Sequence, residues 1–201
     1  MNDARTAILE RVRGALHGTE RAAAPVPRDY RTNPARRPVR PDLLDLFVER
    51  VEDYRARVHR CTPAEVADTL ATVLRRRRTV VPDGFAWPVP QPVPGAGLTA
   101  AELDRIPAVV TTATLGVATT GTLVLTHGEG QGPRAFSLVP DVHVCVLPAD
   151  RVVLGVPEAV AALDPHRPQT WISGPSATSD IELDRVEGVH GPRELHVLVV
   201  T

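Results

Sequence analysis

The sequence contains no lysine, because all 23 of its basic residues are arginine. This absence excludes a Walker-type phosphate lysine, a lysine Schiff base and a lysine general base. Aromatic residues make up only 3% of the 201 residues, so valine, leucine and alanine must build the core. No apolar run approaches the roughly 20 residues of a membrane-spanning helix, and the first residues lack the apolar region of a signal peptide. We therefore expect a cytoplasmic protein without a membrane span.

Cysteine is also scarce. Cys61 and Cys145 fall in different predicted elements and form neither a CxxC motif nor a Cys/His metal spacing. No two of the seven histidines have the helical or hairpin spacing of metal ligands. We therefore expect no metal ion and no iron–sulfur cluster to be bound by this chain alone.

Positive charge is concentrated in the N-terminal half, although the net charge is only −1. The run Arg75–Arg78 ends a predicted helix, where cations interact favourably with the helix dipole. No ladder of aromatic residues and no nucleic-acid-binding motif accompanies it. The run is typical of a solvated helix end, and we expect no nucleic-acid partner.

Composition divides the chain near residue 41. Residues 4–17 show helical spacing of apolar residues, and the stretch that follows is rich in proline and arginine. We therefore expect an N-terminal helix and arm over residues 1–41 and an α/β domain over residues 42–201. Within the domain, the pattern predicts helices over residues 42–60, 62–77, 99–104 with a Thr99–Glu102 capping box, and 157–163.

Apolar runs of strand length dominate the second half of the chain. Outer helices and continuous apolar strands are typical of a buried, partly parallel sheet that is covered on both faces. We expect a meander of antiparallel strands in its middle. The predicted strands cover residues 79–82, 108–112, 122–126, 136–139, 142–147, 171–173 and 195–200.

Two stretches before residue 135 are candidate ligand loops. Thr120, Gly121 and Thr122 could offer hydroxyls and a close backbone approach to an anion, although a plain tight turn also explains them. The glycine-rich stretch that ends in Arg134 could close over a ligand, with Arg134 pairing a phosphate or carboxylate. A plain mobile loop explains this stretch equally well. Gly95-Ala96-Gly97 is a weaker candidate, because it follows proline-rich coil and no predicted strand.

The segment from Trp171 to Pro192 combines a short apolar strand, a Gly-Pro-Ser turn and a cluster of short polar side chains. We expect its loop to leave the carboxyl end of a buried strand, where open α/β sheets bind ligands. A helix that begins near Ser179, is capped by Ser179 and Glu182, and ends at Gly188 explains part of this pattern.

The remaining residues of the segment suggest a site for a small anion. Gly174 and Ser176 would bind the anion through backbone N–H groups and a hydroxyl. The candidate catalytic residues are His190, Asp180 and Glu182, which would position the ligand or move a proton.

Three stretches resemble the lactate-utilisation protein C family, the single-domain members of the LUD domain class. They read TTATLGVATTGTLVL, SLVPDVHVCVLPADRVV and WISGPSATSDIELDRVEGVHGPRELHVLVV. The resemblance implies a three-layer α/β/α fold with a mixed, mostly parallel sheet, like that of ribose-5-phosphate isomerase, glucosamine-6-phosphate deaminase and the CoA transferases, here with an N-terminal helical extension. It also implies an operon with iron–sulfur subunits that oxidise L-lactate.

The resemblance therefore leads us to expect an accessory subunit of lactate oxidation to pyruvate that binds a small anionic ligand or cofactor. A free-standing enzyme acting on a phosphorylated or carboxylated metabolite is an alternative. The chain has no lysine and no recognisable CoA-transferase glutamate motif, which argues against independent transferase or isomerase activity. A structural or regulatory interaction module that uses the proline- and arginine-rich arm is a further alternative.

Overall fold

The structure is a computed structural model, and it describes residues 2–18, 25, 40–178, 186–187 and 191–201. The chain forms two compact units, residues 1–31 and residues 32–201. The first contains helix α1 (Asn2–Ala15), which confirms the predicted N-terminal helix. Its apolar side chains Ile8, Val12 and Leu16 are exposed. The domain boundary after residue 41 stays a prediction.

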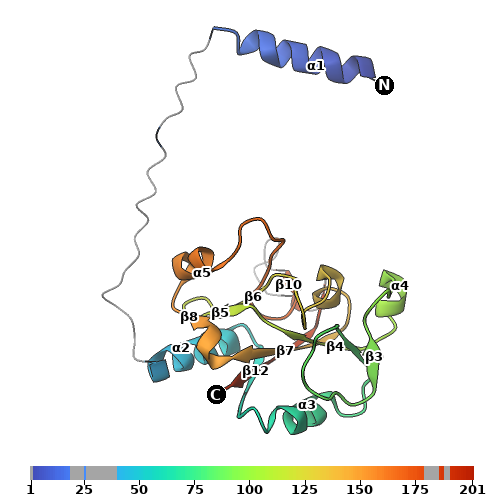
Figure 1. Cartoon of the computed structure of the whole chain (residues 1–201), viewed down its shortest axis with the longest axis vertical. Helices are drawn as coiled ribbons and strands as arrows, with labels where there is room; N and C mark the ends of the chain where they lie inside the picture. The colour runs from blue at the N-terminus through green and yellow to red at the C-terminus, as the bar shows by residue number, and fades with distance from the viewer. Residues whose placement is uncertain (1, 19–24, 26–39, 179–185, 188–190) are drawn as a thin grey trace. The chain divides into compact units, whose positions relative to one another are not determined.

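The centre of the second unit is a six-stranded sheet in which every neighbouring pair of strands is parallel (Figure 1). Its strand order is β1-β12-β7-β4-β2-β3. Strand β7 at its centre is buried over six of its seven residues, as expected of a strand that is covered on both faces. The strands are β1 (Arg57–Cys61), β2 (Thr79–Val81), β3 (Pro92–Pro94), β4 (Ala108–Thr112), β7 (Val142–Pro148) and β12 (Glu194–Val200).

The predicted antiparallel strands form a sheet of their own and do not lie in the middle of the large sheet. This second sheet has the order β8-β5-β6-β9, in which β5 pairs with β6 and β6 with β9 in antiparallel fashion. A further pair, β10 and β11, is also antiparallel. The strands are β5 (Leu115–Val117), β6 (Thr122–Leu125), β8 (Val152–Val153), β9 (Thr170–Ile172), β10 (Ala177–Thr178) and β11 (Val186–Glu187).

Apolar side chains join these layers. Helix α3 (Val66–Leu74) packs Leu70 and Leu74 against one face of the parallel sheet. Helix α2 (Arg40–Asp53) and the second sheet cover the other face, where Phe47 and Leu123 share one core cluster. Helix α5 (Val156–Ala162) packs on the second sheet, and Figure 1 shows α3 and α5 on opposite sides of the unit. The α/β class with a mostly parallel sheet is thus confirmed.

Two local predictions are wrong. The predicted helix over residues 42–60 ends at Asp53, and β1 follows it. Arg55 takes the left-handed φ of +63°, and residues 57–61 then pair with β12, which local periodicity cannot reveal. The predicted strand over residues 136–139 does not form: its first half belongs to a 3-10 helix, η2 (Arg134–Ser137), which buries Phe136 against the sheet.

Helix α4 (Ala100–Leu103) confirms the predicted capping box. The backbone N–H of Glu102 donates to the Thr99 hydroxyl, and the Glu102 carboxylate accepts from the backbone N–H of Thr99. A second 3-10 turn, η3 (Ala149–Arg151), connects β7 to β8.

Candidate functional site

The Thr-Gly-Thr turn and the start of the Gly-Pro-Ser loop are in direct contact. The Thr122 hydroxyl lies 2.7 Å from the Thr120 hydroxyl and 2.8 Å from that of Ser173. The antiparallel pairing of β6 and β9 places Thr122 beside Ser173. The two candidate stretches are therefore neighbours, and we call Thr120, Thr122 and Ser173 the hydroxyl chain.

Gly121 has a packing reason to be glycine. Its φ is +59°, and a Cβ there would lie 2.5 Å from the backbone carbonyl carbon of Arg50 on α2. An open hollow of about 470 Å³ beside the turn is lined by residues that include Arg50, Asp53 and Thr119. The Arg50 guanidinium donates to Asp53 at 3.0 Å, so its charge is already paired. The tight-turn interpretation therefore explains Gly121 without a ligand.

The Gly-Pro-Ser turn is held against the segment that leads into β12. Gly174 has a φ of +81°, and the backbone N–H of Ser176 donates to the Pro192 carbonyl at 2.8 Å. Ser176 is partly buried, and its Cβ lies 3.5 Å from the position that a Cβ of Gly191 would take. The predicted catalytic residues Asp180, Glu182 and His190 lie outside the described residues, as does Ser179.

Two expectations about this segment are wrong. Val186 and Glu187 form β11 and pair with β10, so the predicted helix does not run to Gly188. The loop leaves β9 of the second sheet and returns at the amino end of β12, where the backbone N–H of Arg193 donates to the Asp141 carbonyl. The segment therefore does not lie at the carboxyl edge of the parallel sheet, where ligands usually bind in open α/β folds.

A crevice lies at that carboxyl edge, after β2 and β3. Its volume is about 460 Å³, and the two glycine-rich stretches line it together. Gly95-Ala96-Gly97 follows β3, an edge strand in which proline is tolerated, so the expectation that it follows coil is wrong. We call this cavity the glycine-lined crevice; its lining is Pro82, Asp83, Gly95–Leu98, His127–Glu129, Gly132, Pro133 and Phe136.

Backbone hydrogen bonds fix the second glycine-rich stretch to the sheet. The N–H of Thr112 donates to the Gly130 carbonyl, and the N–H of Gly130 donates to the Asp83 carbonyl, both at 2.7 Å. The stretch thus joins the carboxyl ends of β4 and β2. The Phe136 ring lies within 2.6 Å of any Cβ built on Gly95 or Gly132, so neither position can hold a side chain without movement.

His127 is the most constrained residue of the crevice. It is a non-glycine residue with a φ of +57°, a conformation that costs free energy and is common at functional sites. Its Nδ1 lies 3.1 Å from the Gly132 carbonyl and must therefore donate, which leaves Nε2 to accept from the Thr170 hydroxyl at 2.8 Å. No local motif singles out His127, because the contact to Thr170 spans 43 residues.

One arginine was predicted to bind the ligand and does not line the crevice, and another arginine near the crevice was not predicted. Arg134 is exposed on η2 and does not line the crevice. Arg167, which belongs to none of the predicted ligand loops, has its guanidinium Nη2 3.2 Å from the Cβ position of Gly128. An arginine therefore lies over the glycine-rich stretch, but it comes from the loop that precedes β9.

The described residues contain no cluster of three or more His, Cys, Asp or Glu side chains that could hold a metal ion. Burial raises the pKa of the Cys145 thiol to about 12, and it also raises the pKa of Cys61. Both thiols therefore stay protonated at neutral pH, which makes them poor metal ligands. Among the helices described, none is long and apolar enough to cross a membrane.

Comparison with known proteins finds one relative that matches most of this chain and others that match shorter parts of it. The Lactate utilization protein C of Deinococcus radiodurans is 44% identical over 173 residues, which cover 80% of this chain and 81% of that protein. The Lactate utilization protein C of Anoxybacillus flavithermus is 35% identical over 88 residues, which cover 42% of this chain and 40% of that protein.

A solved structure and a family model agree with these relatives. A crystal structure of a DUF162 family protein from Deinococcus radiodurans matches with a TM-score of 0.67 and 37% identity, covering 82% of this chain and all of that one. The LUD domain model matches residues 99–200. The resemblance that the three sequence stretches indicated is thereby confirmed, and the chain belongs to the LUD domain family.

Proposed function

We propose that this chain acts in bacterial lactate utilisation, as a cytoplasmic accessory subunit of the system that oxidises L-lactate to pyruvate. The observation that carries the proposal is the 44% identity to a Lactate utilization protein C over 81% of that protein. Similarity at this level and over this length supports a shared role.

The hydroxyl chain and the adjoining Gly-Pro-Ser turn would bind a small anionic ligand. Thr122 is only 5% exposed, so its hydroxyl is held in place by the hydroxyls of Thr120 and Ser173. A hydroxyl at the end of such a chain is a preorganised donor for a carboxylate oxygen. Gly174 and Ser176 follow within three residues of Ser173; Gly174 would contribute its backbone N–H and Ser176 its hydroxyl, since the Ser176 N–H donates to the Pro192 carbonyl.

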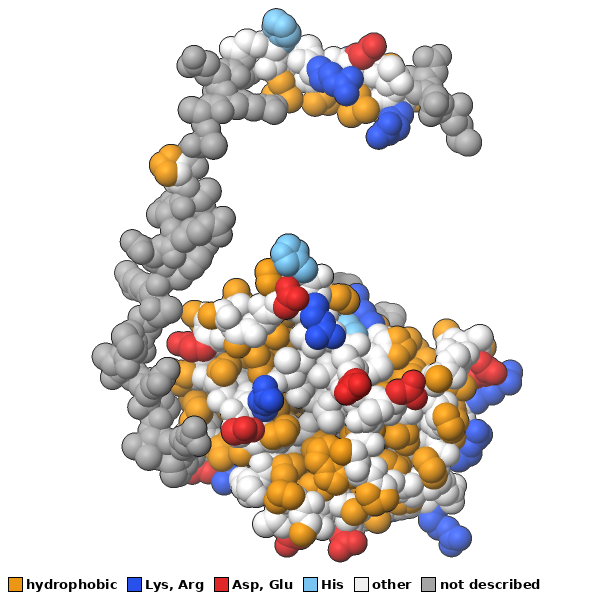
Figure 2. All heavy atoms as spheres, viewed as in Figure 1, with side chains coloured by type: hydrophobic (Ala, Val, Ile, Leu, Met, Phe, Trp, Pro, Cys, Tyr) orange, Lys and Arg blue, Asp and Glu red, His pale blue; other side chains and the backbone are white. Residues whose placement is uncertain are grey.

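The two electrons that leave lactate would pass to iron–sulfur partner subunits. Both cysteines of this chain are buried and have a raised pKa, so neither presents the thiolate that a cluster needs. The charge distribution fits a protein partner better than a nucleic acid, since the face shown in Figure 2 carries acidic side chains beside the basic ones.

The alternative, a free-standing enzyme for a phosphorylated or carboxylated metabolite, draws support from one observation. The glycine-lined crevice lies at the carboxyl edge of the parallel sheet and includes His127 in a strained conformation. Purified chain that converts a metabolite without partners would favour this alternative.

A gene deletion tests the proposed role. The deletion strain is expected to lose growth on L-lactate as sole carbon source and to retain growth on pyruvate, because the block would lie before pyruvate. Expression of the wild-type chain should restore growth on lactate. Normal growth of the deletion strain on lactate, or equal loss of growth on pyruvate, would contradict the proposal.

A further inference from the structure

We propose that the glycine-lined crevice binds an organic anion larger than lactate, a carboxylate or phosphate of cofactor size, and that Arg167 is its charged anchor. This site is separate from the hydroxyl chain, and the inference does not rest on the proposed role in lactate utilisation.

The size of the crevice determines the size of its ligand. Its volume of about 460 Å³ lies within the range of about 300–1,000 Å³ that is typical of pockets for cofactor-sized and drug-sized molecules. Phe136 is buried beneath the two glycine-rich stretches, and Pro82 and Leu98 add apolar surface. Lactate would leave most of this surface uncovered, whereas a ring or an acyl chain would cover it.

The backbone supplies donors from two glycine-rich stretches. Ala96 and Gly97 belong to one stretch, Gly128 and Glu129 belong to the other, and all four residues line the crevice. Among the described residues, none of these four backbone N–H groups donates to a backbone or side-chain oxygen. Backbone N–H groups that converge on a concave surface are a common way to bind anionic oxygens.

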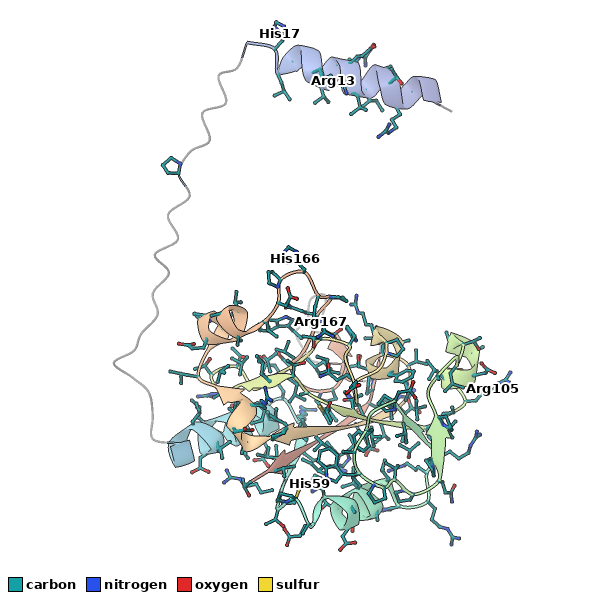
Figure 3. All side chains as sticks on the ribbon, in the orientation of Figure 1. Arg13, His17, His59, Arg105, His166 and Arg167 are labelled. Atoms are coloured by element: carbon teal, nitrogen blue, oxygen red, sulfur yellow. The ribbon has the colours of Figure 1, made fainter. Side chains whose placement is uncertain are left out.

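Arg167 adds the positive charge from beside the crevice: it belongs to the lining of a neighbouring hollow, and it reaches the crevice at Gly128, which is a lining residue. Its Nη2 atom lies beside Gly128, and within the described part of the chain its guanidinium forms no hydrogen bond or ion pair. The absence of a Cβ on Gly128 is what allows the guanidinium to approach the backbone there. Figure 3 shows Arg167 at the end of the unit that lies away from His59. A guanidinium in this position can pair a carboxylate or phosphate through two hydrogen bonds.

Two carboxylates in the crevice further restrict which ligands can bind there. Asp83 and Glu129 are exposed and belong to its lining. They would repel a bare anion such as inorganic phosphate, but they accept hydrogen bonds from hydroxyl or amino groups. The fitting ligand therefore has an anionic end near Arg167 and hydroxyl or amino donors elsewhere.

Thermal unfolding of the full chain with ADP, citrate or L-lactate at equal concentrations tests this site. The panel consists of wild type, Arg167→Glu, Ala96→Trp and two controls, Arg76→Glu and Thr122→Val. Arg76 is an exposed arginine that follows α3, on the other face of the sheet. Ala96 is exposed, so tryptophan there should obstruct the crevice without disturbing the core.

We expect ADP or citrate to raise the wild-type Tm by several degrees and lactate to raise it less, because a ligand of the native state stabilises it by mass action. Arg167→Glu should weaken the apparent affinity about ten- to a hundredfold, as expected for the loss of hydrogen bonds from a charged group. Ala96→Trp should abolish the rise, and Arg76→Glu and Thr122→Val should retain it. A rise with ADP alone identifies a phosphate ligand, and a rise with citrate alone identifies a carboxylate.

Three results would overturn the proposal. The first is no rise with either ADP or citrate. The second is an equal rise in wild type, Arg167→Glu and Ala96→Trp. The third is loss of the rise in Thr122→Val, which would place the ligand at the hydroxyl chain.

Discussion

The imidazoles of His59 and His196 are joined by a hydrogen bond between two neighbouring strands. Nε2 of His59 lies 3.1 Å from Nδ1 of His196, the ring centroids are 5.4 Å apart, and the ring planes differ by 15°. Nε2 of His196 lies 3.4 Å from the Glu194 carboxylate, so it carries a proton. Nδ1 of His196 therefore accepts from Nε2–H of His59, and the His196 ring is neutral in this arrangement.

This pair predicts a loss of stability in mild acid. Burial is the main cause that lowers the pKa of both histidines below 6.5, and Arg57 lowers both further, against the opposing effect of Glu194 on His196. Arg77 also faces Glu194, at 4.0 Å. The unfolded chain therefore binds more protons, and the free energy of unfolding should fall as the pH drops below about 6.5. Urea unfolding at pH 7.5 and 5.5 measures this change.

Variants test whether His59 and His196 cause this loss of stability. We expect the double variant His59→Gln/His196→Gln to lose less stability between these two pH values than wild type. His166→Gln is the control, because His166 is exposed on the loop before β9 and its ring has no hydrogen-bond partner among the described residues (Figure 3). The same pH dependence in the double variant and in wild type would show that the pair is not the cause.

We expect His143 to cause a further loss of folding stability in acid. It is completely buried on β7, its Nε2 lies 2.7 Å from the Thr111 hydroxyl, and its Nδ1 has no hydrogen-bond partner among the residues that the structure describes. Burial lowers its pKa to about 4, so the unfolded chain binds the extra proton first and stability should fall between pH 6.5 and 4. The loss should reach roughly 3 kcal/mol, since one pH unit corresponds to about 1.4 kcal/mol for one proton. His143→Gln should flatten the pH dependence in this range. An unchanged slope of unfolding free energy against pH would show that His143 does not cause it.

Gly121→Ala should destabilise the protein by about 2–4 kcal/mol. The new Cβ would lie 2.5 Å from the Arg50 backbone, and alanine disfavours a φ of +59°. Gly97→Ala is the matched comparison, because Gly97 has a φ of +77° but open space around its Cβ position. It should cost only about 1 kcal/mol. Equal unfolding midpoints of the two variants in urea would argue against the close contact with α2.

Thr122→Val removes the central hydroxyl of the hydroxyl chain and nearly preserves side-chain shape. The hydrogen bonds of this hydroxyl to Thr120 and Ser173 are lost, so we expect a cost of about 1–2 kcal/mol and a folded protein. If the hydroxyl chain binds the ligand of lactate oxidation, this variant should restore growth of the deletion strain on lactate poorly. Thr72→Val on α3 removes a hydroxyl that donates to the Asp68 carbonyl of the same helix, and it should restore growth fully. Equal growth with both variants would show that the hydroxyl chain is not needed for growth on lactate.

Local patterns in the sequence predicted what depends on local interactions. The Thr99–Glu102 box was predictable because both of its hydrogen bonds lie within four consecutive residues. Strand β1 was missed because residues 57–61 continue the apolar spacing of α2, and only pairing with β12, more than 130 residues away, makes them a strand. The second sheet depends in the same way on pairing between distant segments.

The candidate sites show the same division. The contact between Thr122 and Ser173 was not itself predicted, because it depends on the pairing of β6 with β9 between residues that lie 51 positions apart. The glycine-lined crevice was underrated, since Pro92–Pro94 does not have the composition of a strand, although it pairs with β2. Arg167 carried no motif, and only the fold places its guanidinium beside Gly128.

The accessory role is tested by lactate-dependent pyruvate formation in extracts of the deletion strain. If the chain is an accessory subunit, extracts that lack it should form little pyruvate from lactate. Adding the purified chain should restore the rate of pyruvate formation. The purified chain alone should form no pyruvate from lactate. Failure of the added chain to restore pyruvate formation, or oxidation of lactate by the chain alone, would contradict its role as an accessory subunit.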